Sequence, residues 1–543
     1  MIKTRLNRYL DDLKQAAFLA MLIWGVDASC YGQQKKKPNI VIILADDMGY
    51  SDIGCFGSET ATPNLDEMAR KGLKMTQFYN ASRSCPSRAS LLTGLYQHQA
   101  GVGDMMNSRP QPAYQGYLNQ HCVTIAEALK PAGYNTFMAG KWHVGQSPEH
   151  WPVKRGFDHY FGLIDGAASY FGPYPYRPGQ KLTLALDDKP VTPGKGFYST
   201  DAYTDYAIKF IEESRSSGKP FFLYLAYQAP HWPLQALPED IAKYRGKYSQ
   251  GWDRLRADRF LRMKALGLFD KGSRLSPRDP HVPEWESVSD QEKEEWKEKM
   301  AVYAAMIDRM DQNIGRLRKK LREIGEEENT VFMFLSDNGA SHESIKGTGF
   351  LPAIVESSKK LASDPTSFTS YGFQGANVSN TPFRLFKHWE YEGGTATPFI
   401  AYGPSLVKPG SVNNQPGHII DLMSTCLDLA GTSYPKTFNG SRIKATQGIS
   451  LVPLFRGEPW RGHEALFFEH EGNRAVRQGD WKLVSEFPEN KWHLYNTKND
   501  RTELNDLRDK YPEKVKRMAA LYDVWARKSD VIPFEQLIQR KGD

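Results

Sequence analysis

Residues 39–47 read "NIVIILADD", in which an unbroken apolar run at 39–45 is followed by two aspartates. A strand with one face in water alternates apolar and polar side chains, so an unbroken run predicts a strand that is covered on both faces, as in a parallel sheet. Three further runs share this character: "NTFMAG" (135–140), "PFFLYLAY" (220–227) and "TVFMFLS" (330–336). We expect the four runs to be strands of one buried sheet.

Helical patterns separate the four expected strands. They cover residues 64–72, 124–133 and 201–218. Strands that alternate with helices predict an α/β fold with a large, mostly parallel mixed sheet flanked by helices. The charged segment 237–330 is also helical in pattern, whereas the Gly- and Ser-rich segment 341–380 is expected to form a long loop that acts as a lid.

The pattern changes after Pro416. A helical segment at 418–431 is followed by alternating apolar and polar residues between 465 and 487, and then by a final helical segment at 511–528. Alternation of this kind is typical of antiparallel strands with one exposed face. We therefore expect residues 416–543 to form a smaller C-terminal α+β lobe that contains an antiparallel sheet.

The length of 543 residues exceeds what one hydrophobic core usually supports, so we expect a large domain at 38–415 beside the smaller lobe. The net charge of +7 is mild, and its lysines and arginines are interleaved with acidic residues. Without a nucleic-acid-binding motif, this pattern argues against a nucleic-acid partner. Five scattered cysteines are too few for a disulfide scaffold or a zinc site. A single disulfide bond is compatible with the sequence, which does not identify the pair.

The N-terminus has the layout of a secretory signal peptide at residues 1–29. An apolar run at 16–26, too short to span a bilayer, is followed by small residues. Asp27 stands where a lipid-anchor site at Cys30 would need an apolar residue, which argues against lipidation. We expect an exported protein without stable membrane insertion; a buried N-terminal helix is the alternative. The basic residues that precede the run are Lys3, Arg5, Arg8 and Lys14.

Chemically active residues follow each of the four expected strands. Because ligands bind beyond the carboxyl ends of the strands in open α/β sheets, we expect these side chains to share one pocket. In chain order they are Asp46 and Asp47, Lys141 and His143, His231, and Asp337 and Asn338.

The acidic members of this group offer only oxygen ligands, which suit a hard cation such as Ca²⁺ rather than zinc. Carboxylates crowded together without a metal would repel one another and titrate upward. A helix or turn cap is the alternative for one pair alone. The occurrence of Asp46–Asp47 and Asp337–Asn338 at two strand ends favours the cation site.

The basic members suit proton transfer and anion binding. Histidines exchange protons near neutral pH, and lysines bind tetrahedral oxyanions as point charges. Lys387, in the Gly-rich turn "KHWEYEGG", joins Lys141 in this class. The alternatives are structural, hydrogen-bonded histidines and solvated lysines.

The stretch "ASRSCPSRASLLTG" (81–94) contains two adjacent candidate nucleophiles, Ser84 and Cys85. Pro86 suits the first turn of a helix, so Ser84 is expected at a helix N-terminus, which attracts anions. Arg88 lies one helical turn further on and can reach back over residue 84. A plain Ser-Pro helix cap is the alternative.

This stretch is similar to the sulfatase motif, in which Cys or Ser is followed by any residue, Pro, any residue and Arg. That spacing selects Ser84, because counting from Cys85 would place the proline and the arginine one position too early. "NIVIILADDMGYSD", "AGKWHVG", "APHWPL", "LSDNGA" and "KHWEYEGG" also resemble sulfatase elements in family order. The resemblance covers roughly residues 38–510 and is closest to bacterial arylsulfatases, within the alkaline phosphatase superfamily.

The resemblance implies that Ser84 is oxidised to formylglycine by a radical maturase that acts on serine without oxygen. Such a maturase implies an anaerobic bacterium, with oxidation before export to the periplasm. The hydrated aldehyde would take up the sulfuryl group and release sulfate by elimination, whereas a serine sulfate ester would be hard to hydrolyse. The resemblance also implies one Ca²⁺ ion, held by Asp46, Asp47, Asp337 and Asn338.

The other site residues receive their roles from the same resemblance. Arg88 would stabilise the hydrate, and Lys141 and Lys387 would neutralise charge on the sulfuryl group. His143 would deprotonate the second hydroxyl, and His231 would protonate the departing alcohol.

The implied activity is hydrolysis of sulfate monoesters of the arylsulfatase type. Three alternatives remain: an exo-acting sulfatase specific for a sulfated glycan, a two-zinc phosphoester hydrolase of the same superfamily that uses unmodified serine, and a non-catalytic carbohydrate-binding relative. Substrate choice is expected to depend on segments 166–200, 232–300 and 341–380. Within them, 168–179 and Trp232 are candidates to wall the leaving-group pocket; a rigid surface loop is the alternative for 168–179.

Overall fold

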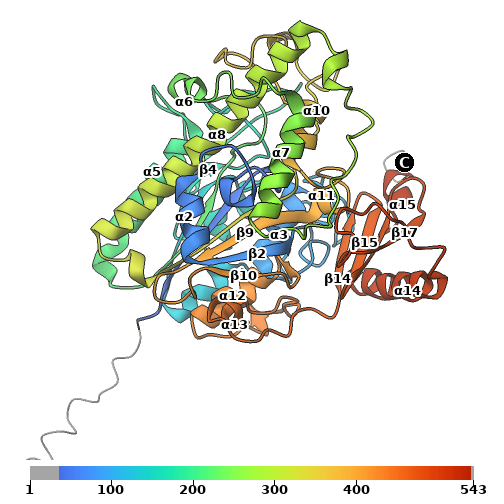
Figure 1. The fold of residues 1–543 in the computed structure, drawn as a ribbon. Coiled ribbons are helices and arrows are strands. Elements are labelled where there is room, and N and C mark those ends of the chain that lie inside the picture. The colour runs from blue at the N-terminus through green and yellow to red at the C-terminus, as the bar shows by residue number, and fades with distance from the viewer. Residues whose placement is uncertain (1–35, 540–543) are drawn as a thin grey trace, which may run out of the picture. The chain divides into compact units, whose positions relative to one another are not determined.

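The computed structural model describes residues 36–539 (Figure 1). Contacts along the chain separate residues 1–37 from a compact unit at 38–543, and the fold below is that of the second unit. The expected signal peptide and Cys30 lie outside the described residues. Within residues 36–539, no helix combines the length and the hydropathy that a membrane span requires.

The four apolar runs form the centre of an eleven-stranded sheet. All neighbouring pairs among these four strands are parallel, which confirms the expected core of the sheet. Three of them have the bounds predicted from the sequence. In spatial order they are β8 (Thr330–Ser336), β1 (Asn39–Ala45), β7 (Phe221–Ala226) and β3 (Asn135–Gly140).

Alternating residues of β1 pack into two different cores, which explains its unbroken apolar character. Val41 and Ile43 face one core, whereas Ile40 and Ile42 face the other. Helices on both faces cover the sheet (Figure 1). The first core includes α2 (Pro63–Lys71), α5 (Ser199–Ser214) and α8 (Asp290–Glu323); the second includes α3 (Ser84–Thr93), α4 (Ile125–Leu129) and α12 (Asp421–Leu429).

Antiparallel pairs appear toward both edges and make the sheet mixed. On one side β9 (Ala396–Tyr402) runs antiparallel to both β8 and β2 (Leu73–Tyr79). On the other side β4 (His159–Leu163) is parallel to β3 but antiparallel to β5 (Leu184–Leu186). The edge strands are β6 (Lys189–Pro190), β10 (Ser411–Asn413) and β11 (Gly417–His418).

The C-terminal segment contains the expected antiparallel sheet and helix (Figure 1). Its four strands pair in chain order, and α14 (Pro512–Lys528) contacts β15 and β17. By contrast, β11 pairs with β2, and α12 packs on α3 and α4, so these two elements complete the large sheet and its helical layer. The strands are β14 (Leu466–His470), β15 (Asn473–Gln478), β16 (Trp481–Ser485) and β17 (Trp492–Asn496).

The segment 341–380 is more ordered than its composition suggested. It contains α9 (Pro352–Ser357) and α10 (Gly372–Ser379), and α10 contacts α7 (Gly251–Ala265). Packing of small buried residues against α7 outweighs the weak helix propensity of glycine and serine. The remaining elements are α6 (Pro238–Ala242), α11 (Glu392–Thr395), α13 (Val452–Phe455), α15 (Phe534–Gln539), β12 (Thr437–Phe438) and β13 (Ser441–Arg442).

Two backbone segments meet directly beyond the carboxyl end of β8. The Gly339 amide donates a hydrogen bond to the Gly394 carbonyl (2.9 Å), and a Cβ atom on Gly339 would overlap the Gly393 carbonyl oxygen. Only glycine at 339 therefore permits this approach. The contact joins the turn that carries Asn338 to the segment that follows Lys387.

We expect Gly339→Ala to lower the free energy of unfolding by about 1–3 kcal/mol, because an added methyl group must push apart two packed backbones. Urea unfolding followed by circular dichroism measures the change. Gly349→Ala is the matched control, since that exposed position has no heavy atom within 4 Å of the added Cβ. Equal stability of the two variants would contradict the close approach.

Candidate active site

The ten residues singled out from the sequence are all buried near the carboxyl ends of the central strands. None is more than 7% exposed, so each charged group needs a partner within the protein. Asp46 and Asp47 follow β1, and the side chains that follow β8 and β3 reach them directly. The convergence expected from strand order is therefore present.

Ser84 is the first residue of α3, directly after its N-cap residue Arg83. Its hydroxyl oxygen lies 3.2 Å from Asp46 Oδ1 and 3.1 Å from Asn338 Oδ1. The Ser87 hydroxyl accepts a hydrogen bond from the Ala81 amide (2.9 Å), which fixes the turn leading into the helix. Ser84 thus faces the two strand ends that carry the acidic groups.

Cys85 faces away from this group. Its Sγ lies 3.9 Å from the Asp104 carbonyl and 3.7 Å from Met105 Sδ, and its side chain is fully buried. Burial raises the pKa of the Cys85 thiol to about 12, so the thiolate is not formed near neutral pH. All four cysteines in the described part of the chain are free thiols: Cys55, Cys85, Cys122 and Cys426.

Arg88 connects the two acidic strand ends. One guanidinium nitrogen, Nη2, lies 2.7 Å from Asp337 Oδ2 and 3.5 Å from Asp46 Oδ1. Nη1 donates to the Lys141 carbonyl (3.1 Å). Burial alone would raise the pKa of Asp337, but Arg88 lowers it to about 2.

The two lysines each bind one of the adjacent aspartates. Lys141 Nζ lies 2.6 Å from Asp46 Oδ2, and Lys387 Nζ lies 3.0 Å from Asp47 Oδ2. Burial raises the pKa of Asp46 to about 8, against the attraction of Lys141. Among the crowded carboxyl groups, Asp337 is therefore strongly acidic and Asp46 weakly acidic, and cationic side chains lie on both sides of them.

The two histidines occupy different environments. His231 Nδ1 lies 2.6 Å from the Trp232 carbonyl, so Nδ1–H donates there and Nε2 faces Asp47 Oδ2 at 3.3 Å. His143 is buried with a positive φ of 57°, and its Nδ1 has no hydrogen-bond partner among the described residues. Burial lowers the pKa of His231 to about 4 and holds that of His143 well below its usual range, so both rings are neutral near pH 7.

The oxygen-rich donor set fits a hard cation. Ligand atoms of Asp46, Asp47 and His231 lie within 4.8 Å of one another. Asn338 Nδ2 donates to Asp47 Oδ1 (2.6 Å), which turns Asn338 Oδ1 toward Ser84. Asp337 instead uses one oxygen for Arg88 and the other for the Asp47 amide (3.1 Å), so its role as a ligand stays a prediction.

Glu343 is a central residue that the sequence reasoning missed. Its Oε2 accepts a hydrogen bond from Trp232 Nε1 (2.8 Å) and lies 3.3 Å from Lys387 Nζ. Its Oε1 lies 3.0 Å from Arg83 Nη1. The residue lies in the segment that the sequence predicted to be a loop. Its position shortly after Asp337 in the sequence was the one pattern that could have identified it.

The turn between β14 and β15 also reaches the site. Glu471 Oε2 lies 3.3 Å from His388 Nδ1, and the backbone amide of His388 donates to the Ser82 carbonyl (2.9 Å). The C-terminal sheet therefore contacts the segment that carries Lys387, and that segment in turn contacts the one that carries Ser84. Sequence patterns placed this sheet in a separate lobe and gave no signal for the contact.

Aromatic residues from three segments surround Trp232. The ring of Tyr176 packs edge-on against it, with centroids 5.5 Å apart, and Phe350 and Phe368 lie 6.1 and 6.2 Å away. The expected substrate segments 166–200 and 341–380 therefore meet at the residue that follows His231.

Comparisons with known proteins show the family of the chain. A family model described as "Sulfatase" matches residues 38–432, and a model of the C-terminal part of N-sulphoglucosamine sulphohydrolase matches residues 383–523. An uncharacterized sulfatase of Schizosaccharomyces pombe is 34% identical over 92% of this chain and 95% of its own length. An arylsulfatase of Klebsiella aerogenes is 35% identical over 81% of this chain and 96% of its own length.

Solved structures share the fold. The structure of Ps i-CgsB in complex with k-i-k-neocarrahexaose has a TM-score of 0.66 and 27% sequence identity. The match covers 90% of this chain and 93% of that protein. The large mixed sheet and the four-stranded C-terminal sheet are thus features of an established architecture.

We expect cation binding to compete with protonation of Asp46. Because the pKa of this carboxyl is about 8 without a cation, binding of Ca²⁺ must release a proton below that pH. The apparent affinity should rise by up to about tenfold per pH unit between pH 6 and 8. Titration calorimetry in two buffers of different ionisation enthalpy measures both the affinity and the proton release.

Asp46→Asn should abolish the proton release, whereas Asp188→Asn, at an exposed position, should leave it unchanged. A Ca²⁺ affinity that is flat across this range, with no proton released, would contradict a protonated Asp46.

Proposed function

The chain belongs to the sulfatase family and hydrolyses sulfate esters, and we propose that it does so through a formylglycine made from Ser84, with Ca²⁺ bound beside it. The observation that carries the proposal is the position of the Ser84 hydroxyl. It lies at the N-terminus of α3, within 3.2 Å of oxygens from Asp46 and Asn338. The neighbouring Cys85 is sealed into the core and takes no part.

The surroundings of Ser84 argue against direct attack by serine. Its only polar side-chain contacts within hydrogen-bond distance in the described chain are Asp46 and Asn338, and neither histidine is among them. A serine nucleophile normally needs an adjacent base. When present, formylglycine supplies a hydrated aldehyde, whose second hydroxyl allows sulfate to be expelled without hydrolysis of an alkyl sulfate.

Fixed cations prepare the site for a sulfuryl group. Arg88, Lys141 and Lys387 are buried and held by ion pairs, so they need little reorganisation when negative charge develops. Ca²⁺, held by Asp46, Asp47, Asp337 and Asn338, would add Lewis-acid polarisation of a sulfate oxygen.

The histidines suit opposite proton transfers. The ring of His143 is neutral, and its Nδ1 has no hydrogen-bond partner among the described residues, so it can take up a proton. His231 is oriented by the Trp232 carbonyl, and the negative charge of a bound sulfate ester would raise its pKa from about 4 toward the range of a general acid. We assign His231 to protonate the leaving-group oxygen and His143 to deprotonate the second hydroxyl of the hydrated aldehyde.

Aryl sulfates are the primary substrate class that we propose. The Trp232 ring lies next to that of His231, where an aromatic leaving group would depart, and Tyr176 packs against Trp232. Sulfated glycans are the second candidate, favoured by the relative that was solved with k-i-k-neocarrahexaose. A two-zinc phosphoesterase is less favoured, because two zinc ions would need several histidine ligands. Among the described residues, the cluster of possible metal ligands around Asp46 and Asp47 contains a single histidine, His231.

Export and maturation belong to the same proposal. A radical maturase that acts on serine would oxidise Ser84 in the cytoplasm of a bacterium, and the chain would then be exported to the periplasm. The proposal rests on the signal-peptide pattern at residues 1–29 and on serine at position 84.

The mass of the tryptic peptide 84–88 tests the modification. We expect it to be two hydrogens lighter than the encoded peptide in protein made with a serine-competent maturase, because oxidation of the alcohol to an aldehyde removes two hydrogens. Cys85 should remain alkylatable. Protein made without the maturase should carry plain serine and be nearly inactive on 4-nitrophenyl sulfate; full activity of that unmodified protein would refute the mechanism.

Leaving-group dependence tests His231. His231→Ala should reduce kcat/KM by about 10²–10⁴-fold for sulfated sugars, whose alkoxide must be protonated, but by about tenfold or less for 4-nitrophenyl sulfate. His159→Ala, at an exposed position, is the matched control and should change neither rate. Equal losses on both substrates would show that His231 is not the acid.

A further inference from the structure

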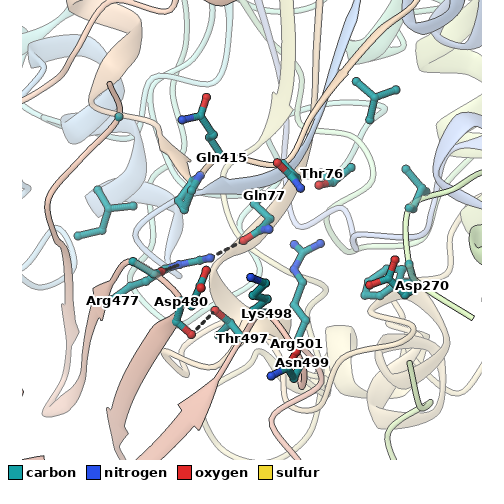
Figure 2. A pocket seen from close by; sticks show the side chains of 18 of the residues that line it. Thr76, Gln77, Asp270, Gln415, Arg477, Asp480, Thr497, Lys498, Asn499 and Arg501 are labelled. Carbon is teal, nitrogen blue, oxygen red and sulfur yellow. Dashed lines mark hydrogen bonds between the residues drawn. The ribbon is translucent and has the colours of Figure 1, made fainter. Parts of the chain in front are cut away.

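A second cleft lies away from Ser84, between the edge of the large sheet and the C-terminal sheet. Its volume is about 670 Å³, within the range of small-ligand sites (Figure 2). Gln77 on β2, Asp270 after α7 and Gln415 before β11 form one side. Arg477 and the segment 497–501 form the other.

The lining of this cleft has an excess of positive charge. Two aspartates line it, Asp270 and Asp480. Four cations also line it: Arg461, Arg477, Lys498 and Arg501. Neither Lys498 nor Arg477 forms an ion pair with any described carboxylate. The positive charge is therefore not fully neutralised within the protein.

Arg501 is fixed in place with one nitrogen unused. Its Nε donates to Glu392 Oε2 (3.0 Å) and Nη1 to the Tyr50 hydroxyl (3.2 Å). The guanidinium also stacks on the rings of Tyr50, Phe269 and Phe383, at 5.1, 5.4 and 4.9 Å from their centroids. Nη2 is buried and has no hydrogen-bond partner in the described part of the molecule. An unpaired buried donor on a cation favours an incoming anion.

Arg477 is held in a comparable way. It is 4% exposed and is fixed by hydrogen bonds to Gln77 and to the Tyr79 hydroxyl. Figure 2 shows the charged ends of Arg477, Lys498 and Arg501 turned toward the same space, with the amide of Gln77 among them. Two fixed guanidinium groups and one exposed ammonium group make a prepared anion site rather than a solvated surface patch.

We propose that this cleft binds an anionic oligosaccharide segment that carries sulfate or carboxylate groups. Amide and hydroxyl side chains, such as Gln77, Gln415 and Thr497, lie beside the cations and suit sugar hydroxyls. The choice of ligand rests on the proposed function, since a sulfatase that acts on a sulfated glycan gains affinity by holding the chain at a second site. Arg501 is bonded to Glu392, five residues after Lys387, so the cleft wall shares a segment with the catalytic site.

The binding experiment uses the full chain with Ser84→Ala, so that binding is measured without turnover. The probes are a sulfated dextran oligosaccharide, neutral dextran of equal length and inorganic sulfate, followed by titration calorimetry. Lys498→Glu and Arg461→Glu are the test variants, because both positions are exposed and tolerate substitution. Lys491→Glu is the matched control, at the opposite end of the β16–β17 hairpin from Lys498.

We expect the sulfated dextran to bind, with each test variant weakening its Kd by about 5- to 20-fold and the control by less than about twofold. Added salt should weaken binding. Equal effects of Lys498→Glu and Lys491→Glu would overturn the proposal, as would equal binding of neutral dextran. Binding of inorganic sulfate as tight as that of the oligosaccharide would overturn the assignment of a glycan.

Turnover of 4-nitrophenyl sulfate by the matured enzyme separates this proposal from the catalytic one. Lys498→Glu should leave kcat/KM for this small substrate unchanged, since it does not fill the cleft. If the chain without cleft substitutions fails to bind sulfated dextran while the matured enzyme turns over 4-nitrophenyl sulfate fully, the cleft proposal alone is refuted. Absence of turnover in matured protein that still binds sulfated dextran refutes the catalytic proposal alone.

Discussion

The fold concentrates buried charge at one place, beyond the carboxyl ends of neighbouring parallel strands. Asp46 and Asp337 leave adjacent strands, and a single arginine, Arg88, contacts both. Removing charges from water is costly unless each is paired, so the helix that carries Arg88 must dock in one register. The same docking brings Ser84 to the acidic groups. The position of Ser84 thus follows from the pairing of these charges.

The central strands and most of the site could be predicted because local sequence determines them. Residues of β1 point alternately into two dry cores, and only an unbroken apolar run satisfies both. The polar residues that follow such runs mark the carboxyl ends of the strands. Because these ends meet at one edge of a parallel sheet, the sequence alone was enough to place Asp46, Lys141 and Asp337 together. The edge strands could not be predicted, because β6 and β11 have only two residues each.

Other features depend on contacts that no local pattern encodes. Glu343 reaches Lys387 and Trp232 from a segment whose composition resembled a loop. The turn at Glu471 reaches His388 from a sheet that the sequence assigned to a separate lobe. Both depend on how distant segments pack, and the second brings the C-terminal sheet against the segment that carries Lys387.

The burial of Ser84 sets an order of events in the life of the chain. Its side chain lies within α3, and the residue is only 2% exposed, between Asp46 and Asn338. A maturase of the kind we propose would have to reach Ser84 before α3 packs, because the folded chain buries this residue. On the proposed route, modification would therefore compete in time with folding, and a molecule that folds first would keep its serine. The yield of active protein then becomes a kinetic quantity, set by how slowly the helix closes over its own first residue.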